Sequence, residues 1–424
     1  MKKYETYKNS GVEWIGEVPE NWKTMRFKHF VDQITTPSTH PHKIALENIE
    51  SKTGKFVSTD SEFEGNGVAF NVDDIVYGKL RPYLQKVWKA EFEGNAIGDF
   101  FVYRVKDNCL PSYLKYVMLS DNFTSAANGS TYGAKMPRVA SEFIANSVWF
   151  LPSLSEQQAI ASYLDYKVGQ IDASVSAINS QIDDLKSYRQ SIISEAVTKG
   201  LNPDAPMKDS GVEWIGEIPE SWDCTKLGWI YMNMGSGTTP DTNNLNYYSE
   251  DGVNWLQTGD LNDSEVIMTS KHVTEFAIKE RGMKLYPAGS IVIAMYGATI
   301  GKVGLLKIET TTNQACCVLP NVDNMYNRYV FYTVQSSKTA LLAKSAGGGQ
   351  PNISQTIIKE HKIPIPSLDE QFVIADYLDS KTSKIDTAIK SLEAQRDDLN
   401  ALKQSIISEA VTGKIDVRDW KPNK

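Results

Sequence analysis

Residues 77–86 place basic, aromatic, amide and glycine residues within one predicted strand and turn, and residues 129–138 form a loop of similar composition. Lys and Arg can neutralise phosphates, Arg and Gln can pair with base edges, and Gly lets a backbone come close to a polymer. A solvated hairpin without a ligand is the alternative. The candidate nucleic-acid contacts of this half of the chain are Lys79, Arg81, Tyr83, Gln85, Lys86, Tyr132, Lys135 and Arg138.

The second half of the chain carries comparable loops with different side chains. Small hydrogen-bonding residues fill 235–239 and 257–260, and three consecutive glycines stand beside Lys and Gln in 344–352. A flexible linker is the alternative interpretation of the glycine run. The candidate contacts of this half are Thr238, Gln257, Thr258, Tyr296, Lys302, Lys344, Gln350 and Asn352.

Sequence motifs for catalysis are missing. The segment 297–303 resembles a phosphate-binding loop, but it is one residue short and has Val303 where a magnesium-binding hydroxyl is needed. His40 and His42 have no further metal-ligating neighbour nearby, which favours a surface loop. We therefore expect no catalytic residue, no bound metal and no cofactor on this chain.

The elements that must position these loops are repeated. SGVEWIGEVPENW at 10–22 recurs as SGVEWIGEIPESW at 210–222, QSIISEAVT at 190–198 recurs unchanged at 404–412, and PSL-x-EQ occurs at 152–157 and 366–371. The chain thus consists of two copies of one unit of roughly 200 residues. Each copy has a short motif, a variable block and a helical segment, so one framework presents two different surfaces.

The helical segments share a spacing of alternately four and three residues between apolar positions. This period of 3.5 is typical of a coiled-coil seam, and short connections favour antiparallel pairing. A helix packed only on its own domain is the alternative. The positions that mark these predicted partner-binding helices are Leu164, Ile171, Ile178, Leu378, Ile385 and Leu392.

Composition limits the class of protein. The formal net charge is −8, but the variable blocks 23–150 and 223–364 are close to neutral, so the acidic excess lies in the linking and helical segments. Each block can therefore present a basic face. No apolar run is long enough to span a membrane, the first residues do not form a secretory signal, and the four cysteines form no CxxC pair. We expect a cytoplasmic protein.

These patterns predict an α+β fold with two mixed α/β domains, separated by an antiparallel pair of long coiled-coil helices in a pseudo-two-fold tandem repeat. The predicted boundaries are 1–150 for the first domain, 151–200 for the first helix, 201–364 for the second domain, 365–414 for the second helix and 415–424 for a tail.

The order of short motif, variable block and long helix, repeated once, resembles the specificity subunit of type I restriction–modification systems. The resemblance covers nearly the whole chain, and the repeated motifs quoted above carry it. It implies a non-catalytic subunit that reads double-stranded DNA, each domain recognising one half of a bipartite target while the helix pair sets the spacer. It also implies two modification subunits that methylate adenine and two restriction or motor subunits, with S-adenosylmethionine, ATP and magnesium on those partners.

Two other classes stay open on sequence grounds. Nine Trp and twenty Tyr residues on a repeated scaffold could suit a carbohydrate-binding module, and a repeated framework could serve as a scaffold protein. Steep salt dependence of binding would favour DNA, because phosphate neutralisation releases counterions and sugar stacking does not.

Overall fold

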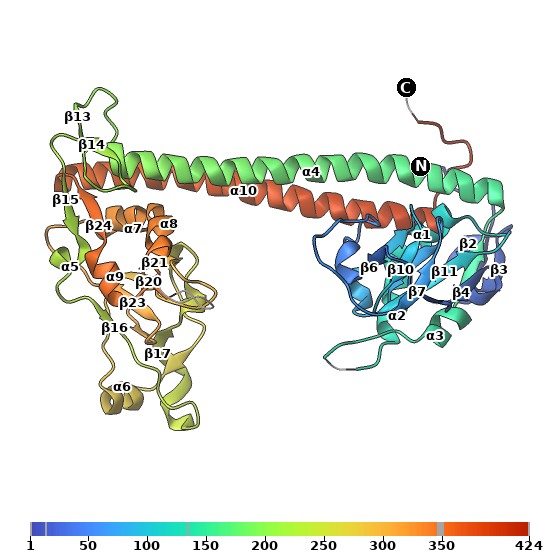
Figure 1. Cartoon of the computed structure of the whole chain (residues 1–424), viewed down its shortest axis with the longest axis horizontal. Helices are drawn as coiled ribbons and strands as arrows, with labels where there is room; N and C mark the ends of the chain where they lie inside the picture. Colours follow the sequence, from blue (N-terminus) through green and yellow to red (C-terminus); the bar gives the residue numbers. More distant parts are fainter. Residues whose placement is uncertain (1, 13–14, 134, 346–351, 423–424) are drawn as a thin grey trace. The chain divides into compact units, whose positions relative to one another are not determined.

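The structure is a computed structural model that describes residues 2–12, 15–133, 135–345 and 352–422 (Figure 1). The chain divides into two compact units. Unit 1 contains residues 1–180 and 392–424, and unit 2 contains residues 181–391. Each unit therefore includes one variable block and part of each of two long helices, α4 (Leu154–Lys199) and α10 (Leu368–Val411).

Unit 1 contains two four-stranded sheets and two strand pairs. Its strands are antiparallel except for the β10–β6 pair. The sheets, in spatial order, are β4 (Val31–Ile34), β11 (Phe100–Val105), β8 (Ile75–Gly78) and β9 (Val87–Lys89), then β5 (Pro37–Ser38), β7 (Gly67–Phe70), β10 (Gly94–Ala96) and β6 (Lys43–Ile44); the pairs are β1 (Tyr7–Asn9) with β2 (Glu17–Pro19) and β3 (Lys23–Arg26) with β12 (Val148–Leu151).

Short helices connect the strands of unit 1. The α-helices are α1 (Pro111–Leu119), α2 (Asp121–Gly129) and α3 (Ser141–Asn146), and the 3₁₀ turns are η1 (Phe27–His29), η2 (Leu46–Asn48) and η3 (Pro82–Leu84). Ser120 is the N-cap residue of α2, and its hydroxyl accepts a hydrogen bond from the Phe123 amide.

The main core of unit 1 is continuous with the long helices. Trp22, Tyr113 and Trp149 pack in one buried cluster with Leu164 of α4 and Ile407 of α10. Each large apolar side chain fully buried in this way stabilises the fold by roughly 1.5–3 kcal/mol. The cluster thus fixes the first block against its segments of α4 and α10.

Unit 2 has a similar strand arrangement with a larger central sheet. Pairing is parallel in β18–β21 and β17–β22 and antiparallel elsewhere. The sheets, in spatial order, are β16 (Gly235–Ser236), β23 (Cys316–Leu319), β20 (Ile291–Ala294), β21 (Val303–Leu306) and β18 (Ser264–Val266), then β19 (His272–Val273), β17 (Tyr248–Leu256) and β22 (Thr311–Thr312); the pairs are β13 (Met207–Asp209) with β14 (Glu217–Pro219) and β15 (Asp223–Lys226) with β24 (Lys362–Ile365).

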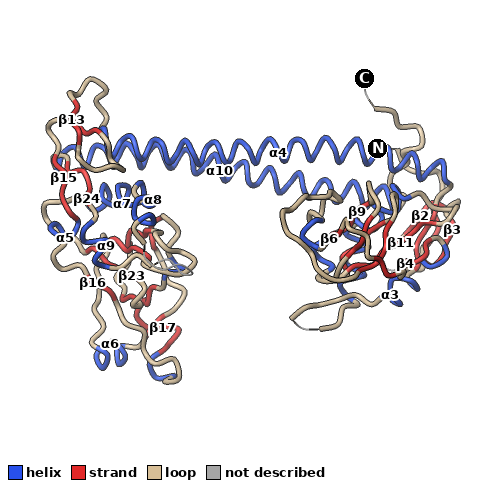
Figure 2. Tube along the Cα trace, viewed as in Figure 1, coloured by secondary structure: helices blue, strands red, loops and turns tan. Residues whose placement is uncertain are grey.

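Short helices also connect the strands of unit 2. They are α5 (Leu227–Ile230), α6 (Glu275–Arg281), α7 (Asn327–Ser336), α8 (Lys338–Ala343) and α9 (Gln355–Glu360), with 3₁₀ turns η4 (Leu245–Tyr247) and η5 (Thr258–Asp260). Figure 2 shows that strands and loops make up most of each unit outside α4 and α10.

The long helices pair through the predicted seam. No position in the four-and-three spacing of apolar residues is exposed on either helix. This includes the two positions of α10 at which the polar Thr382 and Arg396 interrupt the pattern. Leu164 and Ile171 are buried in the core of unit 1, and Leu378 and Ile385 in that of unit 2. The α+β fold class with a pair of long helices is confirmed.

Within the described part of the chain, none of the helices has the length and apolar character needed to cross a membrane.

Candidate nucleic-acid interface

Two candidate loops of unit 1 meet in the structure. The segment after β8 pairs with the segment between α2 and α3: the Arg81 amide donates to the Pro137 carbonyl at 2.7 Å, and the Val139 amide donates to the Lys79 carbonyl at 3.1 Å. Residues more than fifty positions apart thus form one surface, which the sequence alone could not establish.

The same pairing occurs in unit 2. An isolated bridge joins Tyr296 to Asn352, as another joins Leu80 to Arg138 in unit 1. The Ile353 amide donates to the Met295 carbonyl at 2.8 Å, in the position of the Val139–Lys79 bond. Both units therefore present an equivalent loop pair, each beginning at the end of equivalent strands, β8 and β20.

Arg81 is an exposed cation of the unit 1 loop pair. Its backbone lies in the left-handed region (φ 52°), and its side chain is exposed. Among the described residues, no partner forms a hydrogen bond or ion pair with its guanidinium. A non-glycine residue held at positive φ is uncommon and often marks a functional site.

Lys79 and Arg138 are partly neutralised by one carboxylate. Arg138 forms two hydrogen bonds to Asp99, at 3.0 and 2.9 Å, and the Lys79 ammonium lies 3.8 Å from the same carboxylate and 5.4 Å from the Phe101 ring centre. The hydrogen bond from Arg138 lowers the pKa of Asp99, which keeps it charged. Asp99 has no signal in the sequence as part of this site, because only the fold brings it beside these cations.

Gln85 and Lys86 bond to other parts of unit 1. Gln85 is buried, and its amide donates to Asp121 at 3.0 Å. The half-buried Lys86 ammonium donates to the carbonyls of Leu46 (2.7 Å) and Ile49 (2.6 Å), and burial lowers its pKa. The structure corrects the prediction for Gln85, which is not free to contact a polymer, and the two bonds of Lys86 favour a structural role.

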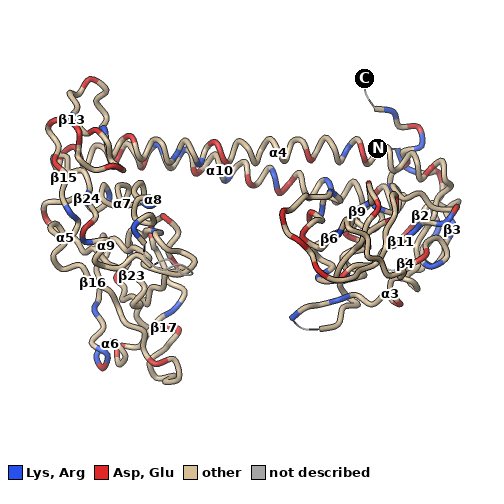
Figure 3. Tube along the Cα trace, in the orientation of Figure 1, with Lys and Arg blue, Asp and Glu red and all other residues tan. Residues whose placement is uncertain are grey.

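The other unit 1 candidates lie at the surface. Tyr83 is 45% exposed, Tyr132 is 60% exposed, and Lys135 is also exposed. Met136, half exposed beside Lys135, is an additional surface residue that had no signal in the sequence beyond its place in the loop. Figure 3 shows the basic residues of each unit interspersed with acidic ones along the chain.

The unit 2 candidates divide between surface and framework. Lys344 and Asn352 are exposed and Tyr296 is half-buried, whereas the Lys302 ammonium donates to Asn262 at 3.1 Å. Gln350 lies outside the described residues.

Three further candidates belong to backbone turns. The Thr238 carbonyl accepts a hydrogen bond from the indole of Trp255 at 3.2 Å. The Gln257 amide donates to Asp260 at 2.8 Å, and Thr258 begins η5. The partly exposed side chains of these three residues border the sheets of unit 2, and the bonds above involve only their backbones.

The six marker positions on the long helices lie inside the chain. Leu164, Ile171, Leu378 and Ile385 are buried, and Ile178 and Leu392 are half-buried. Their side chains therefore join the two helices to each other and to the units, and a partner would have to contact other faces of α4 and α10.

Known proteins share sequence similarity with this chain. A family model described as type I restriction modification DNA specificity domain matches residues 219–394. The type I restriction enzyme MjaVIII specificity subunit of Methanocaldococcus jannaschii is 24% identical and aligns over 95% of both chains. The MjaIX specificity subunit of the same organism is 31% identical over 44% of this chain and 43% of its own.

The fold has a solved counterpart. A chain from a structural study of complex assembly and conformational transition of the type I R-M system superposes with a TM-score of 0.72, at 19% identity, over 94% of this chain and 99% of that one. Matching motifs, repeat order and fold agree: residues 219–394 match the DNA specificity domain of type I restriction–modification systems, and nearly the whole chain is similar to type I specificity subunits.

Proposed function

We propose that this chain, a specificity subunit and not itself an enzyme, recognises a bipartite DNA target, with each unit reading one half through its paired loops. The observation that carries the proposal is the equivalence of the two loop pairs, bridged at Leu80–Arg138 and at Tyr296–Asn352. The backbone pairing is the same while the side chains differ, as expected of two readers with different half-sites.

The exposed side chains suit this role. Arg81 can form a two-pronged contact to guanine, and Asn352 can form one to adenine. Lys135 and Lys344, both exposed, can neutralise phosphates and contribute binding energy that does not depend on sequence. The two units therefore offer different base-reading groups on one framework.

The long helices supply the second part of the proposal. α4 and α10 each contribute to both units, so their paired length would set the spacer between the half-sites. Two modification subunits would dock on the remaining helix faces and methylate adenine with S-adenosylmethionine. Two restriction or motor subunits, using ATP and magnesium, would complete the assembly in the cytoplasm.

Methylation mapping tests the proposal. The chain is expressed with its modification subunit in a host that lacks other adenine methyltransferases, and methylated adenines are sequenced. The expected result is a motif with two fixed halves and an unspecified gap. DNA binding by the purified complex should also weaken steeply with salt. A continuous motif, or no methylation by an assembled and soluble complex, would contradict the proposal.

A further inference from the structure

The two units differ at the ends of the long helices, where the repeat predicts the same surface. In unit 1, Glu156 near the start of α4 is buried, with only 3% of the residue exposed. Its carboxylate accepts hydrogen bonds from the Tyr4 hydroxyl at 2.6 Å and from the Trp22 indole at 3.0 Å. The N-terminal segment thus covers this helix end with a tyrosine.

The C-terminal tail covers the adjoining surface of unit 1. The Asp416 amide donates to the Lys2 carbonyl at 2.9 Å, and the guanidinium of Arg418 lies 5.0 Å from the centre of the Tyr4 ring. The Trp420 ring packs edge-on against Tyr163 of α4, with ring centres 5.2 Å apart. Two chain segments therefore cover this end of unit 1.

In unit 2, a single connector, residues 200–206, lies where unit 1 has two segments. Glu370 is the counterpart of Glu156 in the PSL-x-EQ motif and accepts a hydrogen bond from the Trp222 indole at 3.2 Å. Asp204 occupies the sequence position of Tyr4, so among the described residues no tyrosine hydroxyl reaches Glu370. Glu370 stays exposed.

The uncovered helix-end surface of unit 2 contains a hollow. A hollow of about 380 Å³ lies beside Glu370, lined also by Leu201, Asn202, Asp369, Val373 and Ile374. Val373 is 59% exposed and the neighbouring Phe372 is 43% exposed. This surface therefore combines uncovered apolar side chains with an exposed carboxylate, of which one oxygen accepts a hydrogen bond from Trp222 and the other from the Ser367 hydroxyl at 2.8 Å.

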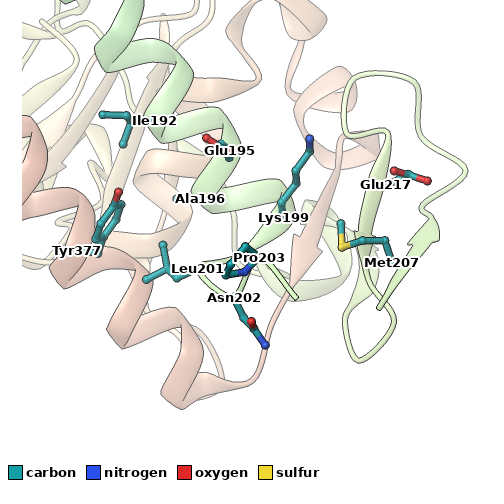
Figure 4. A pocket seen from close by; sticks show the side chains of 11 residues that line it. Ile192, Glu195, Ala196, Lys199, Leu201, Asn202, Pro203, Met207, Glu217 and Tyr377 are labelled. Carbon is teal, nitrogen blue, oxygen red and sulfur yellow. The ribbon is translucent and has the colours of Figure 1, made fainter. Parts of the chain in front are cut away.

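A second hollow lies on the other side of the connector. It has a volume of about 450 Å³, and Tyr377 of α10, the counterpart of Tyr163, lines it together with Glu195, Lys199 and Met207 (Figure 4). No ring equivalent to Trp420 covers Tyr377 among the described residues; Leu201 and Asn202 line both hollows.

We propose that this helix-end surface of unit 2 docks a segment of a partner protein that inserts a tyrosine beside Glu370 and a second aromatic side chain beside Tyr377. The occupant's chemistry is defined by unit 1, where Tyr4 and Trp420 fill the equivalent positions. Asp369, Glu370, Glu195 and Glu217 outnumber Lys199 around the hollows, so the segment carries a basic residue, as Arg418 does in unit 1.

The partner is an associated subunit of the complex, and to that extent the inference rests on the proposed function. A second copy of this chain is disfavoured as the occupant. Its aromatic tail is held in its own unit 1 by the Asp416–Lys2 hydrogen bond and the Lys2–Asp419 ion pair, and an intramolecular contact has the advantage of high effective concentration.

Crosslinking in the full-length chain tests the surface without altering its packing. A benzophenone side chain is placed at Val373, or at the equivalent unit 1 position Ala159 as the matched control, and the chain is assembled with its modification subunit. Light should crosslink the subunit at position 373 and not at 159, to a peptide that contains tyrosine. Equal crosslinking at both positions, or crosslinking between two copies of the chain, would overturn the proposal.

A substitution gives the energetic test. Val373→Lys adds to an exposed apolar position a charge of the same sign as the basic segment and should weaken binding of the modification subunit about tenfold, while Asp376→Ala on the same helix should have no effect. With subunit added in excess, the methylated motif should be unchanged, which separates failure of docking from failure of the proposed function. Unaltered affinity of a folded Val373→Lys chain would refute the docking site.

Discussion

The ammonium of Lys403 on α10 lies 3.0 Å from the carboxylate of Asp172 on α4, and the two side chains are only 5% and 12% exposed. The repeat provides a counterpart in unit 2, where Arg189 on α4 lies 2.9 Å from Asp386 on α10. The pseudo-symmetry thus extends to individual ion pairs, with the roles of the two helices exchanged.

These pairs define the register of the helices. From the first pair to the second, α4 advances from 172 to 189 while α10 retreats from 403 to 386, the same number of residues in the opposite direction. The helices are therefore antiparallel with an unshifted register, and Ser180 is opposite Gln395 by this count.

Replacing Lys403 should destabilise unit 1. Lys403→Ala leaves the poorly exposed Asp172 with only Lys55, 2.9 Å away at the surface, and the loss of a buried charged partner costs about 1–3 kcal/mol. For a unit of this size each kcal/mol lowers the melting temperature by roughly 2–4 °C. Calorimetry measures the change, with the exposed Lys381→Ala as control. Equal melting of both variants would show that the pair does not stabilise the helices.

The same ion pair predicts a pH dependence. Burial alone would raise the pKa of Asp172, but hydrogen bonds and charges from Lys55 and Lys403 outweigh burial and lower the pKa below its ordinary value of 3.8. Because the folded pKa is depressed, the stabilisation is complete above the ordinary value and is lost as the pH falls through the folded one. The difference in melting temperature between the natural chain and Lys403→Ala should therefore shrink below about pH 4. A difference that stays constant down to pH 2 would contradict this account.

Arg81 should contribute to sequence preference in the first half-site. Arg81→Ala should cost roughly 1–3 kcal/mol of target binding and relax specificity in one half of the motif, and Arg81→Lys should keep the charge but lose the two-pronged contact. Lys135→Ala should weaken binding to all sequences alike and reduce the salt slope by about 1. Competition binding with variant DNA sites separates these outcomes. An unchanged motif in both Arg81 variants would remove this residue from the interface.

Lys86 should affect stability and not recognition. Lys86→Met retains the aliphatic stem but removes the donor to the Ile49 carbonyl and one of the two donors to the Leu46 carbonyl, at a cost of about 1–3 kcal/mol. Lys89→Met, which removes a partly exposed ion pair with Asp73, should cost only about 0–1 kcal/mol. Thermal unfolding and methylation mapping are measured on both variants. A shifted motif in a stably folded Lys86→Met chain would restore Lys86 as a DNA contact.

The helix pair should act as a spacer. Four residues inserted after Ser180 and after Gln395 nearly preserve the 3.5-residue seam and add about 6 Å, close to two base pairs at about 3.4 Å each. Since neither loop pair changes, both half-sites should be retained while the gap between them grows by one or two base pairs. Sequencing of methylated adenines provides the measurement. Efficient methylation at the original spacing would show that the helices do not set the gap.

Exchange of the first variable block should alter one half-site only. The block 23–150 begins in β3 and ends in β12, and these strands pair with Lys23 opposite Leu151, so its two ends are adjacent. A relative's block can therefore be joined at a strand pair outside the candidate loops. The expected motif keeps the second half-site and acquires a new first one. A change in both halves would contradict independent reading by the two units.

The sequence predicted the elements whose signals are local or repeated. The seam from Leu164 to Leu185 has an apolar period that is visible in any helical projection, and the matched motifs identified the two copies without a structure.

The roles of individual side chains in the loops were harder to predict from the sequence. Lys86 and Arg138 look alike as basic residues in glycine-containing segments, but Lys86 meets carbonyls about forty residues away and Arg138 meets Asp99. Such partners depend on strand order, which local pattern does not determine. The role of the exposed candidates in binding DNA stays a prediction.

The identical segments QSIISEAVT at 190–198 and 404–412 lie at the carboxyl ends of α4 and α10. In genetic terms the gene encodes the same peptide twice. A crossover between the two stretches would delete or duplicate 214 residues, one variable block with one long helix, and would rejoin the helix in phase. The repeat that gives the protein its symmetry therefore also allows a whole variable block to be gained or lost in one event.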